Sequence, residues 1–311
     1  MPEPKPKLEL CHNQTPVHHI HGIHPHTYTL CAANTVIACK FCGSKNIIKF
    51  GTEKGVQLYM CKDCGRKFNE KDTPEGYRTN TAMIANAMSM FFGGLSYAEI
   101  GRQLETIYHE TVTSVTIYRW VMEYSRKAHD FMDKQKAKVS DTWIVDETVV
   151  SVAGKNVWYW DVIDEGTRFL IDTHLSESRT INDVVILFQH CKKRTTTIPH
   201  FILSDGLRAY IDGIERVFGS EAHHIVAKGL TAEINTNLIE RFHSTLKERY
   251  KVMRGLKTME SAWIVLNGFV VNYNFFRPHM TLNNTTPAHA AGIKLPFNDW
   301  EGFIRYEQTT T

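Results

Sequence analysis

The sequence changes its period at residue 141, from helical spacing to short runs rich in valine, isoleucine, tryptophan and tyrosine. Three such runs fill "DTWIVDETVVSVAGKNVWYWDVIDEGTRFLIDTHLS", and the words AGKN and DEGT between them are typical of hairpin turns. The residues that follow predict a helix over 180–195, a strand over 200–204, a helix over 206–218, a strand over 222–227 and a long helix over 235–253. The order βββαβαβα predicts an α/β domain with a mixed sheet, in which an antiparallel meander is extended by parallel strands through helical crossovers.

This element order is similar to that of the ribonuclease H fold, in which the fourth strand lies beside the first. Asp146 falls in the middle of the first run, among isoleucine and valine, and Asp205 ends the fourth strand. An acid at such a position is costly unless it meets a charge or a metal. Neighbouring strands stand roughly 5 Å apart, so we expect these two carboxylates to be able to share one ion.

The last helix supplies a third acid. Its apolar residues form one stripe when each residue turns by about 100°, namely Ile239, Phe242, Leu246, Tyr250 and Met253. Glu240 lies just off this stripe. A carboxylate there can lean toward the sheet, while Lys247 and Lys251 of the same helix reach outward to phosphates.

Asp146, Asp205 and Glu240, with 34 residues between the last two, resemble the D,D,E triad of insertion-sequence transposases and retroviral integrases. The words VDET, SDGLRAY and NTNLIERFHSTLKER and the tail YNFFRPHMTLNNTTPAHA agree with this resemblance, which covers about 141–292. The resemblance implies a DDE transposase that binds the ends of an insertion sequence and cleaves and joins DNA strands. It implies three catalytic acids that hold two Mg²⁺ (or Mn²⁺) ions, one on each side of an in-line displacement at phosphorus.

Other acids compete for the catalytic role. Glu147 adjoins Asp146, but strand alternation directs it to the opposite face of the sheet. Asp161, Asp164 and Asp172 fall on the hairpin strands or turns, where we expect solvated or structural acids.

Three alternative functions follow from the same residues. A nuclease or resolvase of the same fold would use similar metals without joining strands. A catalytically idle DNA-binding regulator would not require all three acids, which are present. A zinc-dependent metabolic enzyme would need an open metal site with histidine ligands in the core.

Two CxxC pairs, CKFC at 39–42 and CKDC at 61–64, are separated by 18 residues. Two tight pairs offer four thiolates to one tetrahedral zinc, so Cys39, Cys42, Cys61 and Cys64 predict a structural zinc ribbon over 36–72. A disulfide pair is the alternative, but no secretion signal precedes it. The His-rich residues 1–35 match no ligand spacing and are interpreted as an N-terminal arm.

Residues 80–128 carry apolar positions at helical spacing in three short stretches, which resemble an all-α helix-turn-helix domain. Ser96 is expected to cap the second helix, with Glu99 at the capping-box position, and Ser114 to cap the third. Thr116 and Arg119 are then free to contact DNA. A generic three-helix packing unit is the alternative interpretation.

The 311 residues, 22% of them charged, suffice for several folding units: the arm, the ribbon, the helix-turn-helix, a core at 140–257 and a C-terminal helix and tail at 258–311. The net charge of +3 is small, but basic residues cluster in 240–257 and predict DNA contacts by Arg241, His243, Lys247 and Lys251. No apolar run is long enough for a membrane span, so we expect a cytoplasmic protein. Joining two DNA ends predicts a homodimer or a higher homo-oligomer.

Overall fold

The computed structural model describes residues 37–53, 56–69, 73–74, 77, 79–227, 236–251, 253 and 256–310; the predicted N-terminal arm lies outside them. The first element is a three-stranded antiparallel sheet of β1 (Ile47–Glu53), β2 (Val56–Cys61) and β3 (Lys67–Asn69). Buried Tyr59 and Phe68 stack across β2 and β3, with ring centroids 5.7 Å apart. Strands β1 and β2 pair antiparallel between the two CxxC pairs, as expected of a zinc ribbon.

Three helices follow: α1 (Thr81–Gly93), α2 (Tyr97–Tyr108) and α3 (Ser114–Met132). Ser96 and Glu99 form the predicted capping box at the start of α2. Helix α3 begins one residue earlier than expected, because Thr113 rather than Ser114 occupies the cap and accepts a hydrogen bond from the N–H of Thr116.

The central sheet contains β4 (Thr142–Val152), β5 (Lys155–Asp164), β6 (Leu170–Ser176), β7 (Phe201–Ser204) and β8 (His223–Val226), in the order β6-β5-β4-β7-β8. Strands β4, β5 and β6 pair antiparallel, whereas β7 joins β4, and β8 joins β7, in parallel. Helices α4 (Ile181–Arg194), α5 (Arg208–Phe218) and α6 (Asn237–Lys251) complete the series. The predicted order βββαβαβα and the ribonuclease H-like arrangement are confirmed.

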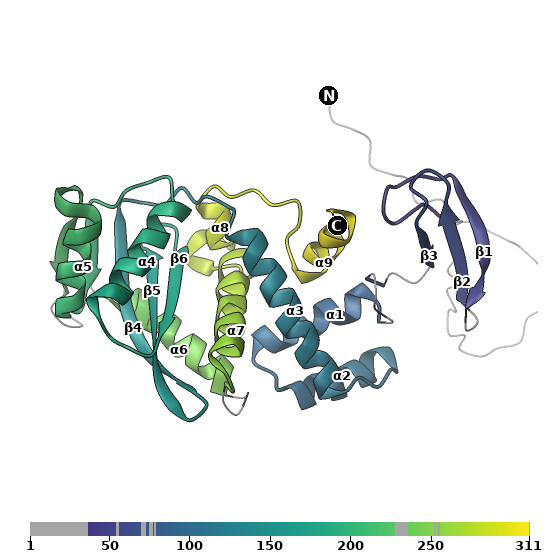
Figure 1. The fold of residues 1–311 in the computed structure, drawn as a ribbon, viewed down its shortest axis with the longest axis horizontal. Helices are drawn as coiled ribbons and strands as arrows, with labels where there is room; N and C mark the ends of the chain where they lie inside the picture. Colours follow the sequence, from purple (N-terminus) through teal and green to yellow (C-terminus); the bar gives the residue numbers. More distant parts are fainter. Residues whose placement is uncertain are drawn as a thin grey trace, which may run out of the picture. The chain divides into compact units, whose positions relative to one another are not determined.

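The two faces of this sheet carry different helices (Figure 1). Glu147 of β4 accepts a hydrogen bond from the Tyr210 hydroxyl of α5, whereas the adjacent Asp146 contacts His243 of α6. Because successive strand residues point to opposite faces, α5 and α6 cover opposite sides of the sheet. The predicted separation of Asp146 from Glu147 is thus borne out by their contacts.

The C-terminal part packs against both the sheet and the helical domain. It contains α7 (Met259–Val271), a π-helical turn η2 (Asn272–Phe276), a 3₁₀ turn η3 (Met280–Leu282), α8 (Pro287–Ala290) and α9 (Trp300–Thr310). Helix α7 packs along α3, and α9 packs along α1. The fully buried Asn274 amide pairs with both backbone groups of Leu170 at the start of β6. Among the described helices, none combines the length and the apolar character that crossing a bilayer requires.

Candidate active site and metal centre

Asp146 and Asp205 come from two strands that are paired in the central sheet, β4 and the end of β7. Strands β4 and β7 run in parallel, and their last registered pair joins Ile144 to Leu203. Asp146 and Asp205 each follow this pair by two residues, so a continued register would direct both to the same face. Strand β7 ends at Ser204, however, and Asp205 lies in the turn that follows it.

A tight turn positions Asp205. Its Oδ1 accepts a hydrogen bond from the N–H of Leu207 at 2.9 Å, and its side chain is exposed. Gly206 adopts a φ of +88°, and a Cβ at this position would lie 2.8 Å from Cγ1 of Val226. A larger residue at 206 would therefore be strained and would displace the carboxylate before it.

Asp146 faces a buried histidine and a second buried acid. His243 of α6 lies between two carboxylates, with Nε2 2.6 Å from Asp161 Oδ1 and Nδ1 3.6 Å from Asp146 Oδ2. Asp161 of β5 stands directly opposite Asp146 in the antiparallel register and is 0% exposed. The structure therefore directs His243 toward the interior, away from the surface where the sequence predicted a DNA contact.

Burial raises the pKa of Asp146 to about 7, with the charge of Asp161 adding to this effect and His243 opposing it. Burial also raises the pKa of Asp161, against the neighbouring imidazole. Burial opposes protonation of His243, but the two carboxylates raise its pKa above the ordinary value. A nearby cation would lower the pKa of Asp146 again, because a positive charge favours the ionised form of the carboxyl.

Glu240 lies in the first turn of α6, one helical turn before His243. Residues three apart share a side of a helix, so Glu240 is on the side from which His243 reaches Asp146. The side chain is exposed, and its Oε1 accepts a hydrogen bond from Thr236 Oγ1 at 2.8 Å. Lys247 and Lys251 continue this stripe and are exposed, as predicted.

The structure brings the three predicted acids together only in part. Oxygen is the ligand that Mg²⁺ prefers, so the donor types of Asp146, Asp205 and Glu240 fit a hard divalent cation. Their ligand atoms, however, do not all lie within 4.8 Å of one another; among the described residues only a cysteine group meets that condition. The fit thus rests on the donor chemistry, on the pairing of β4 with β7, and on the position of Glu240 in α6.

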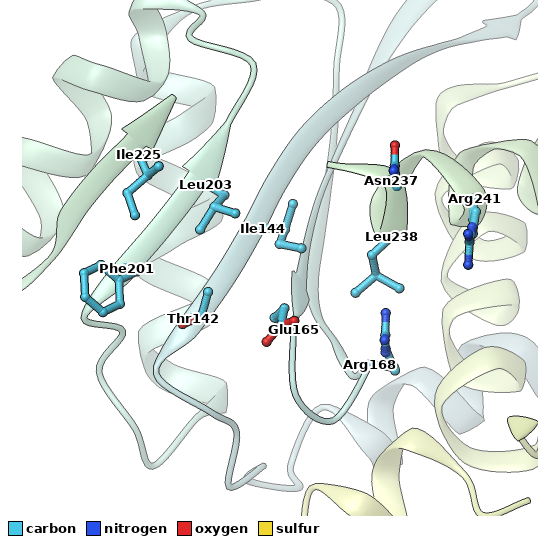
Figure 2. Close-up of a pocket in the computed structure, with 10 residues that line it drawn as sticks. All are labelled: Thr142, Ile144, Glu165, Arg168, Phe201, Leu203, Ile225, Asn237, Leu238 and Arg241. Atoms are coloured by element: carbon cyan, nitrogen blue, oxygen red, sulfur yellow. The ribbon is translucent and has the colours of Figure 1, made fainter. Parts of the chain in front are cut away.

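A cleft of about 620 Å³ is lined by residues of β4, β7, β8 and α6, and none of the three acids lines it (Figure 2). Ile144, Leu203 and Ile225 lie across three neighbouring strands, and Leu238 of α6 faces them. Ile144 and Leu203 each precede one of the acids by two residues and share its face. Arg168 and Arg241 also line the cleft, so it combines an apolar floor with two cationic groups.

The four cysteines of the CxxC pairs form one cluster, in which every pair of Sγ atoms lies within 4.8 Å. Cys39 and Cys64 are 3.6 Å apart, as are Cys42 and Cys61. Four thiolates bound to zinc at about 2.3 Å in a tetrahedron would stand about 3.8 Å apart. All four are free cysteines rather than disulfides, so the cluster is fit to hold a metal ion.

The remaining sequence-predicted residues lie on helix surfaces. Arg119 of α3 is exposed, whereas Thr116 is half-buried, with its hydroxyl 3.0 Å from that of Thr113. Arg241 of α6 is exposed at the rim of the cleft.

The competing acids have structural partners. Asp164 is fully buried and accepts hydrogen bonds from the backbone and hydroxyl groups of both Ser140 and Thr167. Asp172 pairs with Arg194 at 3.2 Å. Asp161 differs from these two, because its partner also contacts Asp146.

Asp161 and His243 form a buried contact that the sequence interpretation did not predict. Asp161 lies inside the apolar run "NVWYWDVI", the same signal that selected Asp146. The hairpin register sets Asp161 opposite Asp146, and this register could have been predicted from the position of the turn AGKN.

Known proteins are similar to the part of the chain that contains these acids. Residues 140–279 match a family described as a DDE domain. A transposase for the insertion sequence-like element IS431mec of Staphylococcus aureus is 23% identical over 210 residues, which are 65% of this chain and 88% of that protein. An uncharacterized protein of Methanocaldococcus jannaschii is 26% identical over 165 residues, 52% of this chain and 69% of its own length.

Two solved structures share the arrangement at low similarity. The catalytic core domain of HTLV-2 integrase in complex with magnesium superposes with a TM-score of 0.40 and 12% identity, over 50% of this chain and 99% of that one. The catalytic core domain of BIV integrase gives a TM-score of 0.38 and 17% identity, over 49% and 93%. The fold assignment rests on the strand order of the central sheet rather than on these two structures.

Proposed function

We propose that this protein, whose residues 140–279 form a DDE transposase domain, is a DNA transposase that uses Asp146, Asp205 and Glu240 to cleave and join DNA strands. The observation that carries the proposal is the parallel pairing of β4 with β7: Asp146 and Asp205 each follow its last registered pair by two residues, and α6 covers the face on which Asp146 lies. Glu240 reaches this face from the first turn of α6.

Asp146, Asp205 and Glu240 would hold divalent cations, Mg²⁺ or Mn²⁺. When bound, such ions activate an attacking oxygen and stabilise a leaving oxygen at phosphorus. The chain's own residues would supply the anionic cage and the surface that holds the DNA backbone. A cation would also offset the repulsion between these carboxylates when they converge on it.

The basic residues around the site would position the DNA. Lys247 and Lys251 extend the stripe of Glu240 along α6, and all three are exposed. Arg241 and Arg168 line the cleft between the sheet and α6. Cationic side chains at these places fit phosphate contacts that fix the register of the duplex without reading its sequence.

The test is a strand-transfer assay with purified protein, Mg²⁺ and DNA that carries the inverted repeats flanking the gene. A transposase yields joined products. A nuclease or resolvase of the same fold would yield cut DNA alone, and an idle regulator would bind without cutting. The absence of joined products under conditions of full end binding would contradict the proposal.

Assembly as a homodimer or higher homo-oligomer is part of the same proposal, because two element ends must be joined in one event. Mass measurement in solution, with and without end DNA, distinguishes a monomer from these assemblies.

We further propose zinc as the metal of the four-cysteine cluster, and expect roughly one tightly held zinc per chain. Cys39→Ser should release the zinc and unfold the ribbon, because a small module of this kind folds on its metal. Elemental analysis and the proton signals of Tyr59 and Phe68 report the two effects. Cys191→Ser is the matched control, since this buried cysteine lies outside the cluster and should retain the zinc. Wild-type protein without zinc would refute the assignment.

End recognition is assigned to α3. Arg119→Ala should weaken binding to the element end, and a contact with a base edge would account for about 1–3 kcal/mol of discrimination. Competition binding against end DNA and scrambled DNA measures this. Arg305→Ala on α9 removes the same charge from an exposed helix and should leave discrimination unchanged. Full, sequence-specific binding by a protein that starts at residue 135 would place recognition elsewhere.

A further inference from the structure

The Asp161–His243 pair has no part in the proposed chemistry, yet it occupies a costly position. Asp161 is 0% exposed and His243 is 7% exposed. The Oδ2 atom of Asp161 has no hydrogen-bond partner among the described residues. Buried ionisable pairs are weak contributors to stability compared with apolar residues of the same volume. Stability alone therefore does not explain why an acid and a histidine occupy these two buried positions.

The contact with Asp161 decides which atom of His243 meets Asp146. Nε2 lies 2.6 Å from Asp161 Oδ1, so this nitrogen is engaged and Nδ1 is the ring atom that faces Asp146 Oδ2 at 3.6 Å. This orientation holds whatever the charge of the ring. At 3.6 Å the contact with Asp146 is a close polar approach rather than a hydrogen bond.

The same contact fixes α6 against the sheet. His243 is the buried polar residue of the apolar face of α6, where its other buried members are Ile239, Phe242 and Leu246. Apolar contacts tolerate sliding, whereas a 2.6 Å bond to an acid on β5 defines the height and rotation of the helix. Glu240 is one turn before His243, so its position over β4 depends on this bond.

We propose that Asp161 and His243 are positioning residues that set the Asp146 carboxylate and the first turn of α6 for binding a divalent cation. Neither touches the reacting atoms: Asp161 orients His243, and His243 orients Asp146 and places Glu240. Partners of this kind behind metal ligands typically change metal affinity by about 10- to 100-fold when they are removed. The inference rests on the proposed function, in which Asp146 and Glu240 are ligands.

The test is Mn²⁺ affinity of the zinc-loaded, full-length protein without DNA, measured from the electron paramagnetic resonance signal of free Mn²⁺. His243→Gln keeps an amide near the Nε2 position for Asp161 and loses the group that faces Asp146. We expect it to melt near the wild-type temperature and to bind Mn²⁺ about tenfold more weakly or worse. His243→Asn, whose amide takes the Nδ1 position, should lose the bond to Asp161 and also bind more weakly.

His174→Gln is the matched control, because His174 of β6 likewise contacts a buried acid, with Nε2 3.2 Å from Asp183 Oδ1. It should keep the wild-type Mn²⁺ affinity. A purely structural role for His243 predicts a lower melting temperature with unchanged Mn²⁺ affinity in the folded variants, and that result would overturn the inference.

The same measurement separates this inference from the proposed function. If Asp205→Asn abolishes Mn²⁺ binding while both His243 variants bind as the wild type does, only the positioning role fails. If Asp205→Asn binds Mn²⁺ normally, the proposed cation site itself is wrong. If a His243 variant does not fold, the other variant and Asp161→Asn decide the question by the same affinity.

Discussion

Asp205→Asn is expected to lower both strand cleavage and strand joining by roughly a thousandfold or more, while leaving end binding intact. The substitution keeps the size and the turn geometry, since an asparagine oxygen can still accept the hydrogen bond from the N–H of Leu207. It removes the negative charge that attracts the cations, whose contribution to such a reaction is several kcal/mol, and each 1.36 kcal/mol is tenfold in rate. Single-turnover assays with Mg²⁺ measure the loss, and Mn²⁺, which tolerates looser geometry, is expected to restore a trace.

The matched control is Asp212→Asn on α5, which removes the same charge from a half-exposed position on another element. It should keep the wild-type rate. Strand alternation would also suggest Glu147→Gln as a control, because Glu147 points away from the site. It is less suitable, because its side chain is almost fully buried and bonded to Arg179 and Tyr210. Wild-type joining by Asp205→Asn would remove the triad from the proposal.

Much of the fold could be predicted from the sequence because local signals and the global order agree. The hairpin words AGKN and DEGT, the β-branched runs and the amphipathic α6 each predict an element, and the order of elements restricts the topology. The structure confirms the strand order β6-β5-β4-β7-β8. The DDE-domain match confirms the resemblance to D,D,E transposases.

The sequence predicted the candidate site only where a single residue departs from the local pattern around it. Asp146 and Asp205 stand out because acids interrupt or end apolar runs, and the pairing of their strands predicts that they lie close together. Asp161 interrupts a run as well, but its meaning depends on facing His243, which is 82 residues away in the sequence. A contact between residues so far apart in the sequence leaves no local pattern. His243 was therefore predicted to contact DNA, from the basic residues around it.

The packing of helices α1, α2 and α3 against the core could not be predicted for the same reason. Phe92 of α1 lies with its ring 5.0 Å from that of Phe269 in α7 and 5.3 Å from that of Trp300 in α9. A Cβ at Gly268 would lie 2.6 Å from Cζ of Phe92, so this helix crossing requires glycine. One aromatic ring of α1 thus contacts two helices that lie far along the chain from it, α7 and α9.

Phe92→Ala is accordingly expected to be the most destabilising single truncation outside the site. Phe92 is 3% exposed, and removing a buried aromatic ring costs about 3–5 kcal/mol, because the cavity cannot close around rigid neighbours. For a chain of this size the melting midpoint should fall on the order of 10 °C. Calorimetry measures the shift, and Ile107→Ala, at a 51% exposed position of α2, should change stability by less than about 0.5 kcal/mol. If Phe92→Ala had the same melting midpoint as Ile107→Ala, the contact of α1 with α7 and α9 would not stabilise the protein in solution.

The same variant tests how end binding is coupled to catalysis. We assign end recognition to α3 and catalysis to the sheet. Below its melting temperature, Phe92→Ala should therefore retain end binding while strand joining falls.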